Sequence, residues 1–143
     1  MKLTPSTEQD IEILKRWSEQ DIDLTHCRID PAWWLTGAEG SLLSFCLQDE
    51  DGPVAYVRLD KKRPDGLIRL HTQFAPREEV AKLRLAKGML KCVPVVQDFC
   101  KQQGGSGIIF QSSSPLLIDF MKRKFGFQSA GSNDYVLLFQ VST

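Results

Sequence analysis

The sequence predicts a single α/β domain, residues 1–143, built on a mixed central sheet of about six to seven strands flanked by helices. Three observations lead to this expectation. The chain has 143 residues, which suits one domain with a core of its own. Three β-type apolar runs follow one another in the middle of the chain. A long helical pattern then separates the last of these runs from the next β-type run, which indicates a right-handed parallel crossover in a sheet with mixed strand directions.

The N-terminal part predicts one strand and one amphipathic helix. "KLT" at 2–4 is expected to form the strand. Thr7 suits the N-cap of the helix, because acidic residues follow it and stabilise the positive end of a helix dipole. The apolar face of this helix is expected to contain Ile11, Leu14 and Trp17, which recur at helical spacing.

An irregular segment at 26–40 carries the adjacent residues Trp33 and Trp34. Two interpretations are open. The favoured one is that the tryptophans plug the core under a loop, because large aromatic side chains bury much apolar area. The alternative is an exposed surface that binds a partner.

Three consecutive strands are expected at 41–48, 53–60 and 67–74. The first two are joined by "DEDG", and an acidic-glycine turn between β-rich runs is a strong hairpin signal. "KKRPDG" supplies the second turn. The three runs therefore predict an antiparallel meander.

The C-terminal half predicts helix, strand, helix and strand. The first helix covers 77–103 and is expected to kink or split at Pro94, because proline removes a backbone donor. "GGSG" then follows a helix and precedes a strand at 107–113. That order favours a turn over a phosphate loop, which would follow a strand and open a helix.

The last helix has well-marked ends. Ser114 suits its N-cap and Pro115 its first position, while Gly126 suits the residue that terminates it. The final strand is expected at 135–141.

Composition narrows the class of protein. The net charge is zero, but residues 1–52 carry 11 acidic and 4 basic residues and residues 53–143 carry 7 and 14, which gives −7 and +7. This balance does not favour nucleic acid as a partner. No run approaches the ~20 apolar residues of a membrane span, and the N-terminus has no apolar signal core, so we expect a cytoplasmic protein without a membrane partner. The spacing of the four cysteines predicts neither a disulfide framework nor a metal site.

The order of these elements resembles the GNAT superfamily of N-acetyltransferases. At residue level the resemblance depends on "FAP" at 74–76, which closes the fourth strand, and on "FMKRKFGF" at 120–127, a helix followed by Gly-Phe. The chain also looks like the short GNAT-like proteins encoded in phage genomes. The resemblance implies a single-domain GNAT-like fold and acetyl-CoA as co-substrate, with no metal.

In that family the fourth and fifth strands separate, and the pantetheine of acetyl-CoA lies between them on exposed strand backbone. The resemblance therefore implies that the backbone of Phe74 and Ala75 contacts pantetheine. Ser112 and Ser114, at the end of the fifth strand, are further candidate contacts.

The family's pyrophosphate loop reads roughly Q/R-x-x-G-x-G/A, and the nearest segment here is "RLAKGM". Arg84 keeps the first position, whereas Lys87 and Met89 replace the two glycines and Gly88 lies out of register. The resemblance implies that Arg84, Lys87, Gly88 and Met89 meet the phosphates, with side-chain charge in place of some backbone amides. The alternative is a solvated basic helix face.

The family's usual proton-transfer residues are replaced. Lys122 stands where a tyrosine acid is common, and Ile68 stands where a glutamate base is common. His71 on the same predicted strand is the candidate catalytic base, because imidazole titrates near neutral pH. By strict alternation it points away from the face of Ile68, and a purely structural histidine is the alternative.

The resemblance thus implies an acetyl-CoA-dependent N-acetyltransferase in which a primary amine attacks the thioester directly in a ternary complex. The expected partner is a small-molecule or protein amine, with a homodimer left open. The alternative is a non-catalytic GNAT-fold module that binds CoA or a protein. A GNAT-like fold that no longer binds CoA is the third interpretation.

Overall fold

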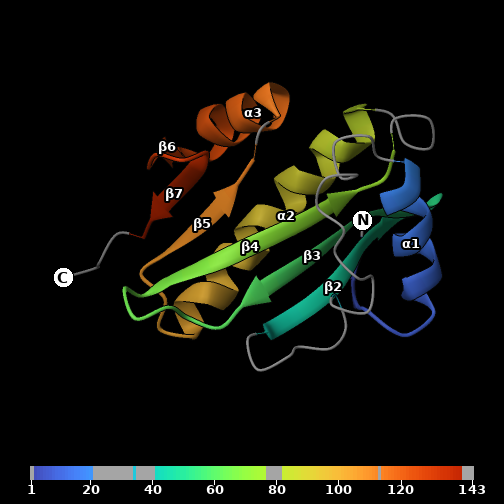
Figure 1. Ribbon diagram of the computed structural model, residues 1–143, viewed down its shortest axis with the longest axis horizontal. Helices are drawn as coiled ribbons and strands as arrows, with labels where there is room; N and C mark the ends of the chain where they lie inside the picture. Colours follow the sequence, from blue (N-terminus) through green and yellow to red (C-terminus); the bar gives the residue numbers. More distant parts are fainter. Residues whose placement is uncertain (1, 21–33, 35–40, 77–81, 113, 140–143) are drawn as a thin grey trace.

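The computed structural model describes residues 2–20, 34, 41–76, 82–112 and 114–139 (Figure 1). Within these residues the chain forms seven strands and three helices. In chain order they are β1 (Lys2–Pro5), α1 (Asp10–Gln20), β2 (Ser41–Asp49), β3 (Gly52–Asp60), β4 (Leu67–Phe74), α2 (Lys82–Gln102), β5 (Gly107–Gln111), α3 (Pro115–Phe125), β6 (Gln128–Ser129) and β7 (Asp134–Leu138).

The strands form one mixed sheet in the order β1-β2-β3-β4-β5-β7-β6. β2, β3 and β4 are an antiparallel meander, as predicted. β4 and β5 are parallel and are connected through α2, which confirms the predicted crossover. The remaining neighbours are antiparallel. The predicted α/β class is therefore confirmed.

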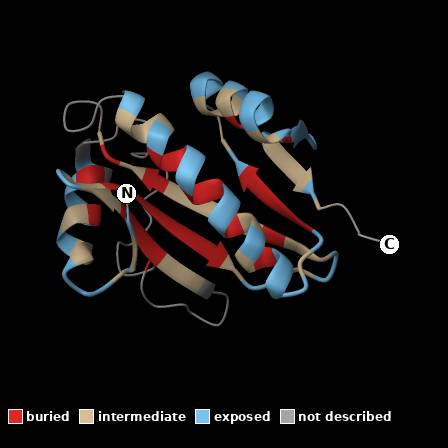
Figure 2. Cartoon of the chain, turned by 180° about the vertical axis from the view of Figure 1, so that it is seen from behind, coloured by how far each residue is buried: buried red, intermediate tan, exposed pale blue. Residues whose placement is uncertain are grey.

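The helices lie on both faces of the sheet. Seen from behind, α2 and α3 cover one face, with their buried residues turned towards the strands (Figure 2). α1 packs on the other face. Successive residues of β3 show this division, because Val57 joins one core cluster and Tyr56 the other.

We call the cluster under α2 and α3 the main core. Its buried members are Phe45, Leu47, Ala55, Val57, Leu59, Ile68, Leu70, Met89, Cys92, Val93, Val96, Cys100, Ile108, Phe110, Met121 and Phe127.

We call the cluster under α1 the minor core. Its buried members are Leu14, Trp17, Trp34, Cys46, Val54, Tyr56 and Ala75. Trp34 is thus a core residue, as the favoured interpretation predicts, whereas Trp33 lies outside the described residues.

The sequence predicted a kink or a split at Pro94, and the bounds of α2 exclude the split. The expected split does not occur, because one helix runs from Lys82 to Gln102 with Pro94 inside it. A proline leaves the carbonyl four residues earlier without its helical donor. That residue is Leu90, which is 46% exposed, so water can reach this part of the helix. Residues 77–81 of the predicted helix lie outside the described residues.

α3 is delimited as the sequence predicts. The Ser114 hydroxyl accepts a hydrogen bond from the Leu117 N–H, and Pro115 opens the helix. Gly126 adopts the left-handed conformation at φ 82°, and its N–H donates to the Lys122 carbonyl. Phe127 then enters the main core, where its ring meets Phe110 edge-on at 5.0 Å.

Candidate functional site

β4 and β5 are paired at one end and separate towards the other. Their register joins Leu67 to Gly107, Ile68 to Ile108 and Arg69 to Ile109. β4 continues to Phe74 and β5 to Gln111 without further pairing between the two strands in the described residues. The two arrows diverge in Figure 1. We call the space between Leu70–Phe74 and the end of β5 the strand gap.

The hydrogen-bond pattern shows which residues of β4 face the strand gap. The Ala75 N–H donates to the Val54 carbonyl at 2.9 Å, so Ala75 bonds towards β3. In an antiparallel pair such residues alternate with residues whose N–H and C=O groups point to the opposite edge. The register with β3 is unbroken along this segment. The backbone groups of Leu70, Thr72 and Phe74 therefore point into the strand gap.

Of the two predicted pantetheine contacts, one has its backbone groups on the gap edge and the other does not. Phe74 has backbone groups on the gap edge, and its carbonyl accepts a 3.4 Å hydrogen bond from the Gln73 side chain. Ala75 directs its N–H to β3, and its side chain is buried in the minor core. The gap edge of β4 also includes Leu70 and Thr72, which were not among the predicted residues.

The two faces of β4 are chemically distinct. Ile68 and Leu70 are buried in the main core under α2. His71 stands directly opposite Arg58 of β3, with no bulge between these strands. It therefore lies on the face that α1 covers, opposite to Ile68, as alternation predicts. We call this face, from β3 across to β7, the polar face.

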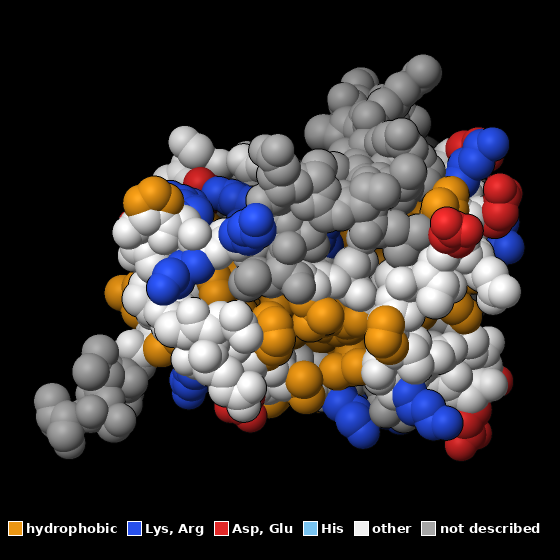
Figure 3. Space-filling model, turned by 90° about the horizontal axis from the view of Figure 1, so that it is seen from below, with side chains coloured by type: hydrophobic (Ala, Val, Ile, Leu, Met, Phe, Trp, Pro, Cys, Tyr) orange, Lys and Arg blue, Asp and Glu red, His pale blue; other side chains and the backbone are white. Residues whose placement is uncertain are grey.

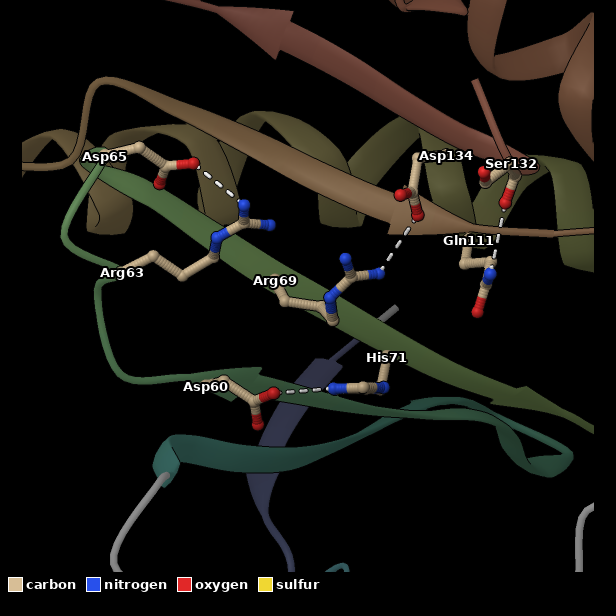
Figure 4. A network of polar contacts seen from close by, with 8 residues as sticks. All are labelled: Asp60, Arg63, Asp65, Arg69, His71, Gln111, Ser132 and Asp134. Atoms are coloured by element: carbon tan, nitrogen blue, oxygen red, sulfur yellow. Dashed lines mark hydrogen bonds and ion pairs between the residues drawn. The ribbon is translucent and has the colours of Figure 1, made fainter. Parts of the chain in front are cut away.

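His71 is bound to a carboxylate on the polar face (Figure 4). Its Nε2 lies 2.7 Å from Oδ2 of Asp60, the last residue of β3. The other oxygen of Asp60, Oδ1, accepts from Nε of Arg58 at 3.2 Å. Arg58 is buried, whereas the side chains of His71 and Asp60 are 28% and 29% exposed. The three residues place an imidazole beside the strand gap with one nitrogen fixed.

A second ion pair reaches from β4 to β7 on the same face. Arg69 Nη1 lies 3.3 Å from Asp134 Oδ1, although β5 stands between the two strands (Figure 4). Gln111, at the end of β5, donates to the Ser132 carbonyl at 3.2 Å. Because Asp134 pairs with Gln111, these contacts connect the last residue of β5 to β7.

The four predicted phosphate contacts all lie inside α2. Met89 is buried in the main core, Gly88 is buried, and Lys87 is exposed. Backbone amides at 88 and 89 are past the first helical turn, so they bond within the helix. The structure does not bring these residues together as one loop.

Arg84 is engaged by Asp49, the last residue of β2. Its Nε donates to Asp49 Oδ2 at 2.6 Å, and its Nη2 contacts Oδ1. The hydrogen bonds from this guanidinium lower the pKa of Asp49 below its ordinary value. Because β3 and β4 separate β2 from the strand gap, this contact turns Arg84 away from the gap.

The serines after β5 stabilise the start of α3. The Ser112 hydroxyl accepts from the Ser114 N–H at 3.1 Å, and Ser114 is the N-cap. Both lie where β5 ends, beside the open end of the strand gap. Lys122, which replaces the family's tyrosine, is exposed in the last turn of α3.

Other chemistry receives no support among the described residues. Burial raises the pKa of the Cys46 and Cys100 thiols to about 11 and that of Cys92 to about 12, so these thiols are poor nucleophiles. Cys27 lies outside the described part of the chain. No group of three or more His, Cys, Asp or Glu residues within the described ranges is arranged to hold a metal ion. None of the described helices combines the length and apolar character needed to cross a membrane.

The surface seen from below combines apolar and charged side chains. Apolar side chains gather across the middle of this view, and basic and acidic groups lie around them (Figure 3). Among the described residues in this view, the basic side chains form no extended stripe of the kind that nucleic acid binding requires.

No family model and no curated protein matches the sequence. Solved structures do match. A GNAT family acetyltransferase from Brucella melitensis, in complex with acetyl-CoA, has a TM-score of 0.63 at 13% identity, covering 99% of this chain and 90% of its own. The aminoglycoside acetyltransferase AAC(6')-Ib, in complex with coenzyme A and kanamycin, has a TM-score of 0.70 at 16% identity, with coverage of 96% and 94%. The ribosomal-protein-S18-alanine N-acetyltransferase from Escherichia coli has a TM-score of 0.68 at 11% identity, with coverage of 99% and 96%. The chain therefore has the GNAT fold that the sequence predicts.

Proposed function

We propose that this chain is an acetyl-CoA-dependent N-acetyltransferase in which a primary amine attacks the thioester directly in a ternary complex. The observation that carries the proposal is the strand gap. Three residues of β4 (Leu70, Thr72 and Phe74) direct backbone donors and acceptors into it.

An open strand edge fits an amide-bearing ligand. Pantetheine contains two amide groups, and an extended chain of that kind can pair with strand backbone as an added strand would. A backbone N–H on the same edge can also donate to the thioester oxygen as negative charge develops there, which is the largest single source of catalysis in many acyl transfers. This role needs backbone and not a particular side chain, so it survives the replacements at Ile68 and Lys122.

The polar face supplies the side from which an amine would approach. The bound co-substrate contributes an electrophilic thioester carbon. The amine nitrogen forms a bond to that carbon, the carbon–sulfur bond breaks, CoA leaves as the thiol, and the amine loses a proton. His71 is the candidate for drawing off that proton, directly or through water, because it lies on β4 in the separated segment.

Two observations bear on which kind of amine is the substrate. AAC(6')-Ib is a fold relative solved with kanamycin, an aminoglycoside. In this chain, residues 1–52 carry an excess of acidic side chains, which favours a cationic substrate. We therefore favour a small-molecule amine over a protein amine.

A second candidate is a GNAT-fold module that holds CoA without catalysis. A specific observation favours it: the two positions where the family keeps its proton-transfer residues hold a buried isoleucine, Ile68, and an exposed lysine, Lys122, whereas the backbone edge that would hold CoA needs neither. Lys87 is exposed and remains a predicted phosphate contact.

Calorimetry with acetyl-CoA, followed by a thiol-release assay across a panel of amines, separates these functions. We expect binding and amine-dependent thiol release. Binding without release would favour the non-catalytic module, and no binding at millimolar acetyl-CoA would overturn both. Lys87→Ala should weaken binding, and Arg84→Ala should do so only if CoA displaces Asp49.

A further inference from the structure

We propose that Asp60 is a positioning residue for His71: its carboxylate fixes the orientation and the tautomer of the imidazole beside the strand gap. This inference rests on the proposed function for its catalytic meaning. The tautomer of the imidazole can be measured even if the protein shows no enzymatic activity.

The geometry of the carboxylate determines the tautomer. A carboxylate only accepts hydrogen bonds, so the His71 nitrogen that lies 2.7 Å from Asp60 Oδ2 must be the donor. That nitrogen is Nε2. Neutral imidazole carries a single N–H, so its lone pair is then at Nδ1. Asp60 thus selects Nδ1 as the atom that takes up a proton in the proposed reaction.

Arg58 holds the carboxylate in place from the other side. Arg58 is 2% exposed, and a buried guanidinium is stabilised by a hydrogen-bonded anion. Its Nε lies 3.2 Å from Asp60 Oδ1, which leaves Oδ2 for the imidazole. Each oxygen of Asp60 therefore has its own partner, and rotation of the carboxylate would break both contacts.

The strands make this arrangement rigid. Arg58 and Asp60 are alternate residues of β3, and His71 stands opposite Arg58 on β4 in an unbroken antiparallel register. A site held by two paired strands is more precise than a site on a loop. The contact spans eleven residues of sequence and depends on the meander, not on local chain geometry.

A second ion pair on the same face provides the matched control. Arg69 and Asp134 have side-chain exposures of 26% and 25%, close to those of His71 and Asp60. On the polar face, Arg58 and Asp60 of β3 and Arg69 of β4 are charged groups close to His71 in the sheet, and Asp134 lies two strands away on β7. Asp134 pairs with Arg69 from β7, which β5 separates from the strand that carries His71. Asp134→Asn therefore removes a carboxylate of similar exposure that does not belong to the Asp60–His71 pair.

Nitrogen-15 NMR of the His71 ring, in the full chain near pH 9 where a typical imidazole is neutral, tests the proposal directly. The wild type should show a proton on Nε2. In Asp60→Asn, the side-chain amide can donate as well as accept, so the Nδ1–H form should appear. Asp134→Asn should keep the wild-type pattern. An unchanged Nε2–H tautomer in Asp60→Asn, or an equal change in Asp134→Asn, would overturn the proposal.

Steady-state kinetics test whether the orientation of His71 by Asp60 affects catalysis. With an amine that the wild type accepts, Asp60→Asn should lower kcat about tenfold or more at nearly constant KM, because proton transfer and not binding is affected. Asp60→Glu, which restores a carboxylate, should recover part of the loss. If Asp60→Asn does not fold by circular dichroism, Asp60→Ser serves for both measurements. Absence of thiol release by the wild type would overturn the proposed function, whereas the NMR result would still decide whether Asp60 sets the tautomer.

Discussion

The paired half of β4 and its separated half differ in what their side chains and backbone do. In the paired half, Leu67–Arg69 bonds to β5, and Ile68 is completely buried in the main core. Gly107, the partner of Leu67 on β5, also lets β5 approach β7 closely, because a Cβ on it would lie 2.5 Å from the Leu137 carbonyl oxygen. In the separated half, Leu70–Phe74 bonds only to β3 within the described strands. His71 projects from this half towards Asp60.

This difference predicts where substitutions should affect stability and where they should affect ligand binding. The paired half closes the sheet and is supported by packing from α2. The separated half keeps one edge of backbone available and one face of side chains polar. Changes in the first half should therefore act on folding, and changes on the gap edge of the second should act on ligand binding.

Ile68→Ala should have the largest effect on stability. It removes three carbons from a side chain that is 0% exposed in the main core, and such truncations cost about 2–5 kcal/mol. Urea unfolding measures the loss. The control is His71→Gln in the separated half, where the side chain is 28% exposed and we expect a loss within about 1 kcal/mol. Equal losses would remove the distinction between the two halves.

A proline scan of the separated half distinguishes its two edges. In Gln73→Pro the lost N–H is one that bonds to β3, because Gln73 alternates in register with Ala75. We expect a loss of roughly 3 kcal/mol in the free energy of unfolding from the missing donor and the misfit of the ring. In Thr72→Pro the lost N–H faces the strand gap, so the cost should be about 1 kcal/mol, while acetyl-CoA affinity falls.

Gln73→Ala is the control for the side chain, because Gln73 also donates to the Phe74 carbonyl. The loss in the free energy of unfolding measured for Gln73→Ala is subtracted from the loss measured for Gln73→Pro. If Thr72→Pro unfolds the protein as readily as Gln73→Pro, then Thr72 does not face an open edge.

The fold could be predicted from local patterns to a large extent. β4 begins and ends where the sequence predicts, because alternation and the "KKRPDG" turn define it locally. The caps of α3 were likewise readable from Ser114 and Gly126. β6 was missed, because its two residues carry no apolar pattern. Of the kink or split predicted at Pro94, the split was wrong: α2 is continuous there, and Val93 and Val96 pack in the main core.

The candidate site was less predictable, because its contacts cross strands and elements. His71 was found from its residue type, and its face followed from alternation. Asp60 was missed, although counting the hairpin register would have placed it on the same face as His71. The contact between Asp49 and Arg84 joins residues 35 apart and depends on where α2 begins, which the sequence pattern did not define.

Ser114→Ala tests whether the end of β5 is a site of stability or of binding. Ser114 caps α3, and loss of such a cap costs about 1 kcal/mol. Ser114→Asn keeps an acceptor for the Leu117 N–H and should restore the stability measured by urea unfolding. If acetyl-CoA affinity falls in both variants while stability is restored in the second, the hydroxyl is a ligand contact, as the family resemblance implies. Unchanged affinity in both would leave Ser114 a structural residue.

The smallest expected effect concerns Asp49, beyond the gap on the far side of β4. Arg84 lowers the pKa of Asp49 in the folded state below its ordinary value of 3.8. A carboxyl with a depressed folded pKa stabilises the fold at pH values above its unfolded pKa, and this contribution disappears as the pH falls through the folded pKa. Acidification from pH 7 to about 2.5 should therefore lower Tm more in the wild type than in Asp49→Asn, by on the order of 2 °C, because the pair is partly exposed and screened.

Asp119→Asn is the control for that measurement. Asp119 pairs with Arg123 one turn along α3, and both side chains are more than 60% exposed. Exposed pairs of this kind contribute little, so the change of Tm with pH should match the wild type. The same titration repeated with acetyl-CoA indicates whether Arg84 changes partner. If the ligand frees Asp49 from Arg84, the difference between wild type and Asp49→Asn should disappear in its presence. A difference that persists would indicate that Arg84 stays bound to Asp49 at the end of β2. The phosphates would then be bound by Lys87 and by other residues near the start of α2.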